Sequence, residues 1–559
     1  MAVTDSSLDD SIDQRTETNS LATLPDELLL HILSFLTPLE LAQAAQTCRR
    51  LAITSYDDIL WNPIVNKAAA ETVPEPTPMR SFRDLYVSLF PYWFLATNRI
   101  WFGDTEPTGK LILARYDSSL GSIVAHQVVA VVARSMDQVS FWEMDRDVLI
   151  HSFNPVVCLD MNQPVLKLDI AGTREEGSVN GSLVGCGRVD YGKETTMETF
   201  AQSGLHSALT LCRALPAGAI SDTTAVWPPL RIPAASRARN ASSDGFKSAG
   251  HAPGSFSEVS QNNFRLKKWA EYHGRTSSSF RAASRIVAAL GIGMPFVEHL
   301  YQDNMEFGPG PKDITTYSSL VPECYIPTLD KPWQGIFVGD YSTHGCEFLL
   351  VTQPDEEHAR PLPSGMDWMR EWFRGGPLNL AAAATVFDDD DEEEEEEEEE
   401  EDGDEDDELH THATEQPDPE VEVRDAETDT FQSTDTVSNA FPYVRSQDYD
   451  DVPSGRLEAI KLTGDPNVPR SQYSFIAPDI GHGGFLRVAD ENTFRGARVV
   501  RAAGHVASRG FREDHYIPSQ LIMISHDRLA QFWQAFGHIS YYTRVDLASL
   551  TRQGAARAS

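Results

Sequence analysis

The chain of 559 residues has no pair of cysteines at a short, regular spacing. Its six cysteines are scattered, which argues against both a structural zinc site and a disulfide framework. No stretch approaches the roughly 18 apolar residues of a transmembrane helix, and the best candidate, VVAVVA at 128–133, has the length of a strand. The first twenty residues contain neither a cationic segment nor an apolar run, so we expect no secretory signal peptide. These absences predict a soluble protein of a reducing compartment, the cytoplasm or the nucleus.

Motifs of catalysis and of cofactor binding are also missing. The run HGGF at 482–485 resembles an esterase oxyanion loop, but the chain has no G-x-S-x-G nucleophile elbow. No glycine pattern of the Walker or Rossmann type follows a predicted strand. His344 with Cys346, and His410 with His412, lack further ligands at zinc spacing. We therefore expect a non-catalytic chain with no metal and no cofactor.

Negative charge dominates the composition. The formal net charge is −38, which makes nucleic acid and anionic membranes poor partners for the bulk surface. Residues 388–408 carry much of it, since 20 of these 21 positions are Asp or Glu. Such a block cannot pack and is expected to be solvated and disordered. Two interpretations remain open: a tolerated surface insertion, which costs little loop-closure entropy, or a lure for basic partners such as histones.

The most informative stretch is LPDELLLHILSFL at 24–36. Pro25 suits the first turn of a helix, and Asp26 and Glu27 favour its positive end. The large apolar side chains of this helix are Leu28, Leu29, Leu30, Ile32, Leu33, Phe35 and Leu36. They cover an arc of roughly 220°, whereas a surface helix needs a stripe of little more than ~100°. The excess face either packs against the rest of this chain or belongs to a different polypeptide.

Two more helices are expected to complete a segment at 21–66. Thr37 ends the first helix, because a following proline disfavours the helical conformation of the residue before it. A second helix is expected from Pro38 to about Leu51, and a third, short helix carries the residues at 59–61. Three helices in about 45 residues make a small core on their own.

These residues resemble an F-box nearly position for position. The matching residues are Leu24, Pro25, Leu28, Ile32, Leu33, Leu36, Leu41, Cys48, Arg49, Arg50, Leu51, Leu60 and Trp61. The resemblance implies that the segment docks on the Skp-type adaptor of a cullin-RING (SCF) ubiquitin ligase, which would cover the excess apolar face. The adaptor contacts that it implies are Leu24, Pro25, Leu28, Ile32, Leu33, Leu36 and Leu39. The core residues that it implies are Leu41, Cys48, Leu51 and Trp61.

The rest of the chain is predicted to be rich in β-structure. No repeat of roughly 20–50 residues is present, so a propeller or a horseshoe is not expected. Short β-rich runs between turn residues favour a barrel or a sandwich, with a hairpin at 109–132 and two strands at 333–353. Two helices are expected among the strands, one at 264–274 and one that begins after Ser525. The apolar face of the second helix would be Leu529, Phe532, Trp533 and Phe536.

The predicted fold class is α+β: an N-terminal three-helix F-box, then a mainly antiparallel, barrel-like β domain with a few helices and long disordered insertions. We expect a disordered tail at 1–20, the F-box at 21–66, a first β part at 80–387 with a loop-like insertion at 200–265, an acidic disordered insertion at 388–446, a second β part with a closing helix at 447–550, and a tail at 551–559.

The β-rich part is similar to a group of F-box proteins related to F-box only protein 31. The similarity rests on WQGIFVGDYSTHGCEF, IAPDIGHGG, ASRGFREDHYIPSQL and FGHISYY. It implies a closed β domain that holds a segment of the target, and a relative in this group recognises C-terminal tails. The chain departs from that pattern at 341–345, where Ser342 stands in place of a glycine that could adopt a positive φ.

Candidate residues for binding a target are Tyr341, His344, Glu347, Arg498, Arg501 and Arg512. The three arginines belong to a set of five between positions 495 and 512, in an otherwise acidic chain. On a strand Arg498 and Arg501 would face opposite sides. Both solvated arginines and a clamp for a carboxylate therefore remain open.

Together these patterns predict the substrate-recognition subunit of an SCF-type E3 ubiquitin ligase, which directs a bound protein to ubiquitination and proteasomal degradation. The expected partners are the Skp-type adaptor, through it a cullin-RING core, and a protein target for which a terminal or acidic tail segment is a candidate. Nucleic acid and membranes are not expected as partners. Two alternatives stay open: an F-box scaffold or regulator that delivers no substrate, and an acidic chromatin or histone-binding protein.

Overall fold

The computed structural model describes residues 21, 24–132, 139–151, 155–169, 190–197, 205–216, 226–241, 251–270, 313–341, 345–355, 357, 359–369 and 454–556. The chain divides into two units, Met1–Gly376 together with Val452–Ser559, and Pro377–Asp451. All described residues belong to the first unit. The tail expected at 1–20 and the acidic insertion expected at 388–446 lie outside the described residues.

Four helices, rather than the expected three, form the segment at 21–66. They are α1 (Asp26–Leu33), α2 (Pro38–Ala44), α3 (Arg49–Ser55) and α4 (Asp58–Ala69). The expected second helix is wrong as a single element, because the chain becomes extended at Cys48, the N-cap of α3. Thr37 and Glu40 form a capping box that fixes the start of α2, and the Asp57 side chain caps α4.

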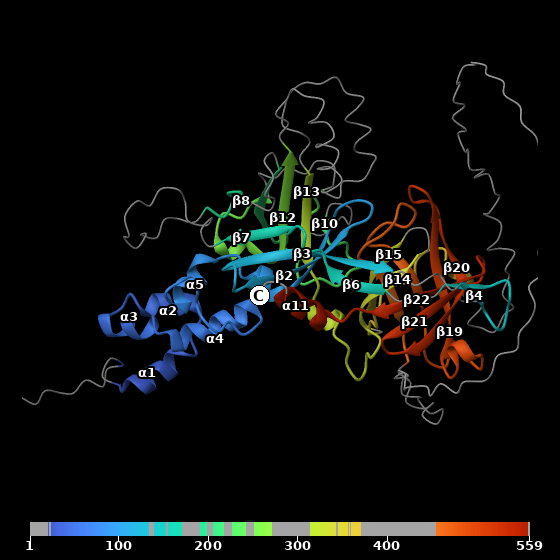
Figure 1. Ribbon diagram of the computed structural model, residues 1–559, viewed down its shortest axis with the longest axis horizontal. Helices are drawn as coiled ribbons and strands as arrows, with labels where there is room; N and C mark the ends of the chain where they lie inside the picture. The colour runs from blue at the N-terminus through green and yellow to red at the C-terminus, as the bar shows by residue number, and fades with distance from the viewer. Residues whose placement is uncertain are drawn as a thin grey trace, which may run out of the picture. The chain divides into compact units, whose positions relative to one another are not determined.

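Helices α5 (Phe82–Ser88) and α6 (Phe94–Asn98) lead into a nine-stranded antiparallel sheet (Figure 1). Its order is β6-β3-β2-β1-β13-β12-β9-β8, and β7 also pairs with β3. The strands are β1 (Ile100–Gly103), β2 (Lys110–Asp117), β3 (Ser122–Val132), β6 (Pro155–Leu159), β7 (Leu166–Asp169), β8 (Thr195–Met197), β9 (Leu205–Arg213), β12 (Val259–Ala270) and β13 (Asp313–Ser319). The hairpin expected at 109–132 is confirmed as β2 and β3.

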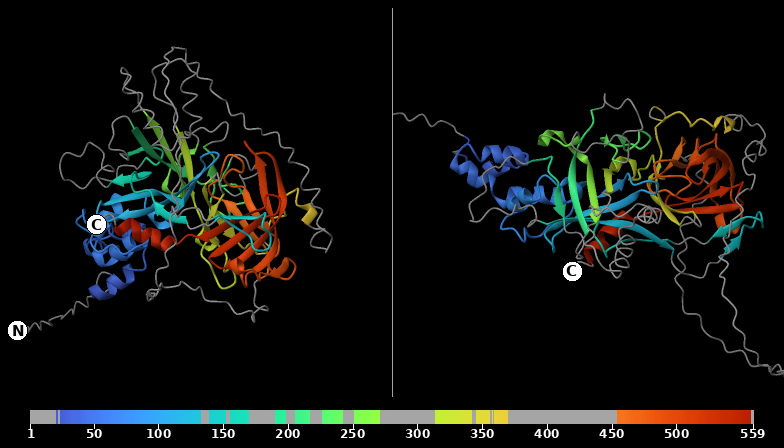
Figure 2. Two further views of the ribbon diagram at one scale, coloured as in Figure 1. Left: turned by 45° about the vertical axis from the view of Figure 1, so that its right-hand side comes forward. Right: turned by 90° about the horizontal axis from the view of Figure 1, so that it is seen from above.

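One apolar core joins the N-terminal helices to this first sheet. It contains Leu29 and Leu33 of α1, Trp61 of α4, and Trp101 and Phe264 of the sheet, whose rings meet edge-on at 4.9 Å. Helix α6 contacts β2 and β12, and both views of Figure 2 show the blue N-terminal helices next to this sheet. A small helical segment is therefore stable here because it shares the core of a larger sheet.

The C-terminal strands form a closed barrel of eight antiparallel strands. The order is β14-β15-β16-β17-β19-β20-β21-β22, and β14 closes the ring by pairing with both β15 and β22. The strands are β14 (Gly335–Asp340), β15 (Cys346–Thr352), β16 (Leu457–Lys461), β17 (Tyr473–Ala477), β19 (Arg498–Ser508), β20 (Arg512–Ser525), β21 (Arg528–Trp533) and β22 (His538–Arg544). The barrel-like fold and the two strands expected at 333–353 are thus confirmed.

Shorter elements complete the described fold. Strand β18 (Phe485–Val488) pairs with β19, and β5 (Leu149–His151) joins β22 in parallel and β4 (Val139–Phe141) in antiparallel fashion. The others are β10 (Val226–Trp227), β11 (Ala238–Arg239), the 3-10 turns Phe256–Glu258, Pro322–Cys324 and Asn492–Phe494, and α11 (Leu547–Ala556). Helix α11 contacts β2 and β6. The tail expected at 551–559 is therefore wrong for residues 551–556, which belong to this helix. Within the described residues, no helix is long and apolar enough to cross a membrane.

Three further expectations for the β domain are wrong. Residues 264–270 of the helix expected at 264–274 are part of β12, in which Phe264 and Leu266 alternate into the core, and residues 271–274 lie outside the described residues. The closing helix expected after Ser525 is the hairpin of β21 and β22, whose residues alternate in the same way. The loop-like insertion expected at 200–265 contains β9, β10, β11 and the start of β12.

Candidate functional site

The first candidate site is the outward face of α1, a helix whose N-terminus is held by α3. Arg50 Nη2 lies 2.6 Å from Asp26 Oδ1 and also donates a hydrogen bond to the backbone carbonyl of Leu24. At the other end the Ser34 hydroxyl donates to the carbonyl of His31. The backbone of α1 is therefore fixed relative to α3.

Both the inner and the outer face of α1 are apolar. Leu29 and Leu33 point inward, and 0% and 2% of their surfaces are exposed. Leu28, Ile32 and the following Phe35 lie on an adjacent, outward side at spacings of four and three residues, and are 52%, 39% and 75% exposed. Since α1 already buries one apolar face in the protein's own core, folding does not explain the second face.

The neighbouring helices carry two more exposed apolar side chains. Leu39, at the start of α2, and Ile53 of α3 are each about two-thirds exposed, and both helices pack with their neighbours in the same bundle. We call the set Leu28, Ile32, Phe35, Leu39 and Ile53 the helical apolar face. Phe35 and Ile53 were missing from the expected contacts. Phe35 lies within the apolar arc of the sequence, whereas Ile53 lies beyond the expected end of the second helix, at about Leu51.

The structure places the expected adaptor contacts at three levels of burial. Pro25, Leu28, Ile32 and Leu39 are exposed, and Leu24 and Leu36 are half-buried. Leu33 is wrong as a surface contact, because it belongs to the core beneath α1. The helical pattern could not separate Leu33 from Leu28, since both lie within the same wide apolar arc.

The core expected for this segment is confirmed at two of its four positions. Leu41 and Trp61 are buried, and Trp61 Nε1 donates to the carbonyl of Ser55 at 2.7 Å. Leu51 is half-buried. Cys48 is exposed, because it occupies the break between α2 and α3.

The second candidate site is the interior of the barrel, into which every second residue of each strand points. One part of the interior is apolar. Its residues include Phe337, Leu349, Val351, Leu457, Ala459, Phe475, Val500, Ala502, Leu521, Met523 and Leu529. The remainder is polar, which is unusual for a closed eight-stranded barrel and marks it as a candidate for function or for specificity of packing.

A buried lysine is the centre of the polar part. Lys461 Nζ lies 2.9 Å from Glu347 Oε2 and 2.7 Å from Asp465 Oδ2, and 4.4 Å from the centroid of the Tyr341 ring. The Tyr341 hydroxyl shares a hydrogen bond with the hydroxyl of Ser474. We call Glu347, Lys461 and Asp465 the lysine cluster.

The two carboxyl groups of the lysine cluster differ in proton affinity. Burial raises the pKa of Glu347 to about 8, and the nearby Lys461 opposes this only in part. Burial also acts to raise the pKa of Asp465, but Lys461 and several hydrogen bonds outweigh it and lower that pKa to about 2. Near neutral pH the shared proton is therefore mainly on Glu347, and Asp465 carries the negative charge.

A second hydrogen-bond network adjoins the first in the barrel interior, since the rings of Tyr341 and Tyr542 lie 6.2 Å apart. The Tyr542 hydroxyl donates to Gln531 Oε1 at 2.9 Å, and Gln531 Nε2 donates to Ser519 Oγ at 3.0 Å. Glycine is required beside this network, because a Cβ on Gly504 would lie 2.2 Å from Trp533 Cζ3. At this level the barrel is filled by its own side chains, as expected for eight strands.

The residues expected to bind a target do not form one cluster. Tyr341 and Glu347 meet around Lys461. His344 lies outside the described residues. Arg498 Nη2 donates to the carbonyl of Gly481 at 2.7 Å, and Arg501 Nη1 donates to that of Gly483 at 3.2 Å, so both arginines hold the same loop.

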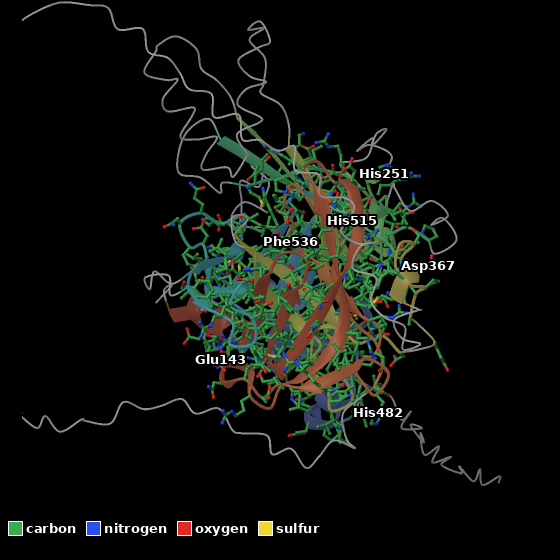
Figure 3. All side chains as sticks on the ribbon, turned by 90° about the vertical axis from the view of Figure 1, so that its right-hand side faces the viewer. Glu143, His251, Asp367, His482, His515 and Phe536 are labelled. Carbon is green, nitrogen blue, oxygen red and sulfur yellow. The ribbon has the colours of Figure 1, made fainter. Side chains whose placement is uncertain are left out.

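Arg512 lies at the far end of the same strand pair. Arg498 stands opposite Met523 in the register of β19 and β20, whereas Arg512 stands opposite Ser508. Figure 3 shows His482, in the loop that the first two arginines hold, and His515 of β20 at opposite ends of the barrel. The hypothesis that Arg498, Arg501 and Arg512 form one carboxylate-binding clamp is therefore wrong.

Sequence reasoning missed Lys461, Asp465, Tyr542 and Gln531. For Lys461 a signal exists: LEAIK alternates, and its apolar positions Leu457 and Ala459 place Lys461 on the same inward side. Its partner Glu347 is more than a hundred residues away in sequence, so only the pairing of β15 with β16 brings the two charges together.

Two family models match the chain. Residues 21–67 match the F-box-like domain, a stretch that contains α1 to α3 and most of α4. Residues 317–549 match the cyclin D1 binding domain, a stretch that runs from β13 through the whole barrel to the start of α11. The chain therefore carries an F-box-like domain, followed by a barrel that is similar to the cyclin D1 binding domain.

Proposed function

We propose that the chain is the substrate-recognition subunit of an SCF-type ubiquitin ligase, and that it is related to the group of F-box only protein 31. The F-box-like domain would bind the Skp-type adaptor, and the barrel domain would bind a target protein. The chain itself would supply no catalytic residue. Its contribution is proximity, because it holds a lysine of the target near the ubiquitin carrier that the cullin-RING core recruits.

The helical apolar face carries this proposal. Its five large apolar side chains lie in water on helices whose inner faces are already packed. Fully burying one such side chain stabilises a complex by roughly 1.5–3 kcal/mol, so an adaptor that covered the face would gain a large apolar contribution. A scaffold that delivers no substrate would use the same face, so adaptor binding alone does not separate these two functions.

The barrel supplies the argument for delivery of a target. The description of the matching family names cyclin D1 as a bound protein, which makes a cyclin or a cyclin-like segment a candidate target. Arg509 and Arg512 are exposed together in the hairpin between β19 and β20. Exposed arginines favour an acidic or C-terminal segment, since guanidinium groups bind carboxylates bidentately. Because the interior is filled, we expect the segment to bind at the rim or on the outer wall.

The adaptor contact is tested by co-expression of the full chain with a Skp-type adaptor, followed by size-exclusion chromatography. Leu28→Asp and Phe35→Asp are expected to abolish a one-to-one complex, because each buries a charge in an apolar contact. Val87→Asp on α5 is the matched control, since Val87 is 52% exposed, as Leu28 is, but lies outside the F-box-like domain. If the folded wild type elutes alone, the proposed function fails.

A further inference from the structure

The positive charges of the barrel domain are almost all arginines. Residues 317–549, which match the cyclin D1 binding domain, contain fifteen arginines and two lysines, Lys331 and Lys461. Residues 1–316 contain nineteen arginines and eight lysines. Lysine thus makes up two of the 17 cationic residues in 317–549 and eight of the 27 in 1–316.

Neither lysine of the barrel domain lies on the outer wall of a barrel strand, although 29% of the Lys331 side chain is exposed. Lys461 is the one lysine of the eight barrel strands, and it is 2% exposed, inside the lysine cluster. Lys331 precedes β14, and its Nζ is 2.8 Å from Asp355 Oδ1. The outer wall of the barrel strands thus presents arginine and no lysine.

Among the lysines that the structure describes, the two that are exposed lie in the other part of the first unit. Lys67, near the end of α4, and Lys193, before β8, are exposed. Lys167 of β7 and Lys267 of β12 are partly exposed and pair with Asp169 and Glu194. All four belong to the F-box-like domain or to the first sheet.

Arginine and lysine differ in the reaction that a ubiquitin ligase promotes. The lysine amine attacks the thioester carbonyl of the loaded carrier, a C–N isopeptide bond forms, the C–S bond breaks, the carrier leaves as its thiol, and the amine loses a proton. The guanidinium keeps its proton and does not act as this nucleophile. Replacing lysine by arginine therefore keeps the charge of a surface and removes its acceptors.

We propose that the barrel wall is kept free of ubiquitin acceptors, so that ubiquitin passes to the bound target and not to the domain that holds it. This inference rests on the proposed function. A receptor that positions its target near the carrier also brings its own surface near the carrier, and any barrel lysine would compete at the same high effective concentration. Modification of the receptor itself is then confined to lysines outside the barrel strands.

The test is a self-ubiquitination reaction of the full chain with the adaptor, the cullin-RING core, a ubiquitin carrier and ubiquitin, with the modified sites mapped by mass spectrometry. Arg495→Lys and Arg509→Lys place acceptors at two exposed positions that flank β19 and keep the charge. Arg80→Lys, exposed between α4 and α5, is the matched control in the lysine-bearing part. We expect wild type to carry ubiquitin outside the barrel strands, and both barrel variants to gain it at the substituted positions.

The outcomes separate this inference from the proposed function. If the adaptor complex forms and the substituted barrel positions stay unmodified, the barrel is spared for another reason and the inference fails alone. Modification of Lys461 in the folded wild type would also overturn it. If no adaptor complex forms, the proposed function fails and the inference fails with it.

Discussion

The guanidinium of Arg470 donates a hydrogen bond to the backbone carbonyl of Asp104, so the loop between β16 and β17 holds the loop between β1 and β2. Arg470 Nε also donates to the carbonyl of Thr105 at 2.9 Å, and the cation lies 4.5 Å from the ring of Trp227. The barrel and the first sheet are therefore joined through buried polar contacts.

Replacing Arg470 by alanine is expected to lower the free energy of unfolding by about 3 kcal/mol. The substitution leaves two buried carbonyl groups without their charged donor, and it removes the cation from the face of Trp227. Arg470→Lys keeps the charge but not the planar fork, so its effect should be intermediate. Urea denaturation of the full chain measures both. Arg495→Ala, at an exposed position, should change the free energy by less than about 0.5 kcal/mol, and an equal effect of Arg470→Ala would contradict the role of this joint.

Glu347 is expected to make the barrel less stable as the pH rises. Burial raises its pKa to about 8 in the folded chain, above the ordinary value of 4.5, so the folded state binds more protons than the unfolded state between these values. The contribution of Glu347 to the free energy of unfolding is therefore fully present below about pH 4.5, and it is lost as the pH rises through 8. Glu347→Gln keeps the shape and removes the titration. Urea denaturation measures the free energy of unfolding of both proteins. Between pH 5 and pH 8.5 this free energy should fall by on the order of a few kcal/mol more in wild type than in Glu347→Gln.

Asp104 provides an internal control for that experiment. Burial raises its pKa to about 6, so it contributes a slope of the same sign in both wild type and Glu347→Gln. The comparison of the two proteins cancels this slope and isolates Glu347. Parallel pH profiles would mean that Glu347 is ionised in the folded chain at all these pH values.

Gly504→Ala is expected to destabilise the barrel by about 1–3 kcal/mol or more, because its Cβ would meet the Trp533 ring. Combining it with Trp533→Leu should recover part of the loss, since the smaller side chain makes room for the methyl group. The measurement is a double-mutant cycle in urea. Strict additivity of the two substitutions would show that the close approach of Gly504 and Trp533 does not limit the packing.

The sequence predicted a strand pairing where the signal for it was local, and it failed where the period of the apolar residues was ambiguous. The turn DSSLGS between two β-rich runs is a local signal, and β2 and β3 form where it predicts them. The helix predicted after Ser525 is wrong because the apolar residues of LAQFWQAF fit both the helical period of 3.6 residues and the strand period of two. Its apolar residues match a helix, whereas Leu529, Gln531 and Trp533 alternate into the barrel. A glutamine at an inward position hides this alternation, and its partner Tyr542 is known only once the hairpin has formed.

The candidate sites divide in the same way. The part of the helical apolar face on α1 and at Phe35 follows from a repeat within thirteen residues, so its existence could be predicted, although the division of α1 into inner and outer leucines could not. The lysine cluster depends on the register of β15 and β16, which places Glu347 and Lys461 on one side of the sheet across the whole acidic insertion. Closure of the barrel by β14 and β22 is equally non-local.

Truncation of Leu28 and truncation of Leu33 should affect different properties, because Leu28 belongs to the outer face of α1 and Leu33 to its inner face. Leu33→Ala is expected to lower the free energy of unfolding by about 2–5 kcal/mol, as a cavity-forming substitution in the core. Leu28→Ala should change it by less than about 0.5 kcal/mol and should weaken adaptor binding instead, with the loss measured by titration calorimetry. If Leu28→Ala destabilises the isolated chain as much as Leu33→Ala does, the outer leucines serve the fold, and the case for an adaptor on this face is lost.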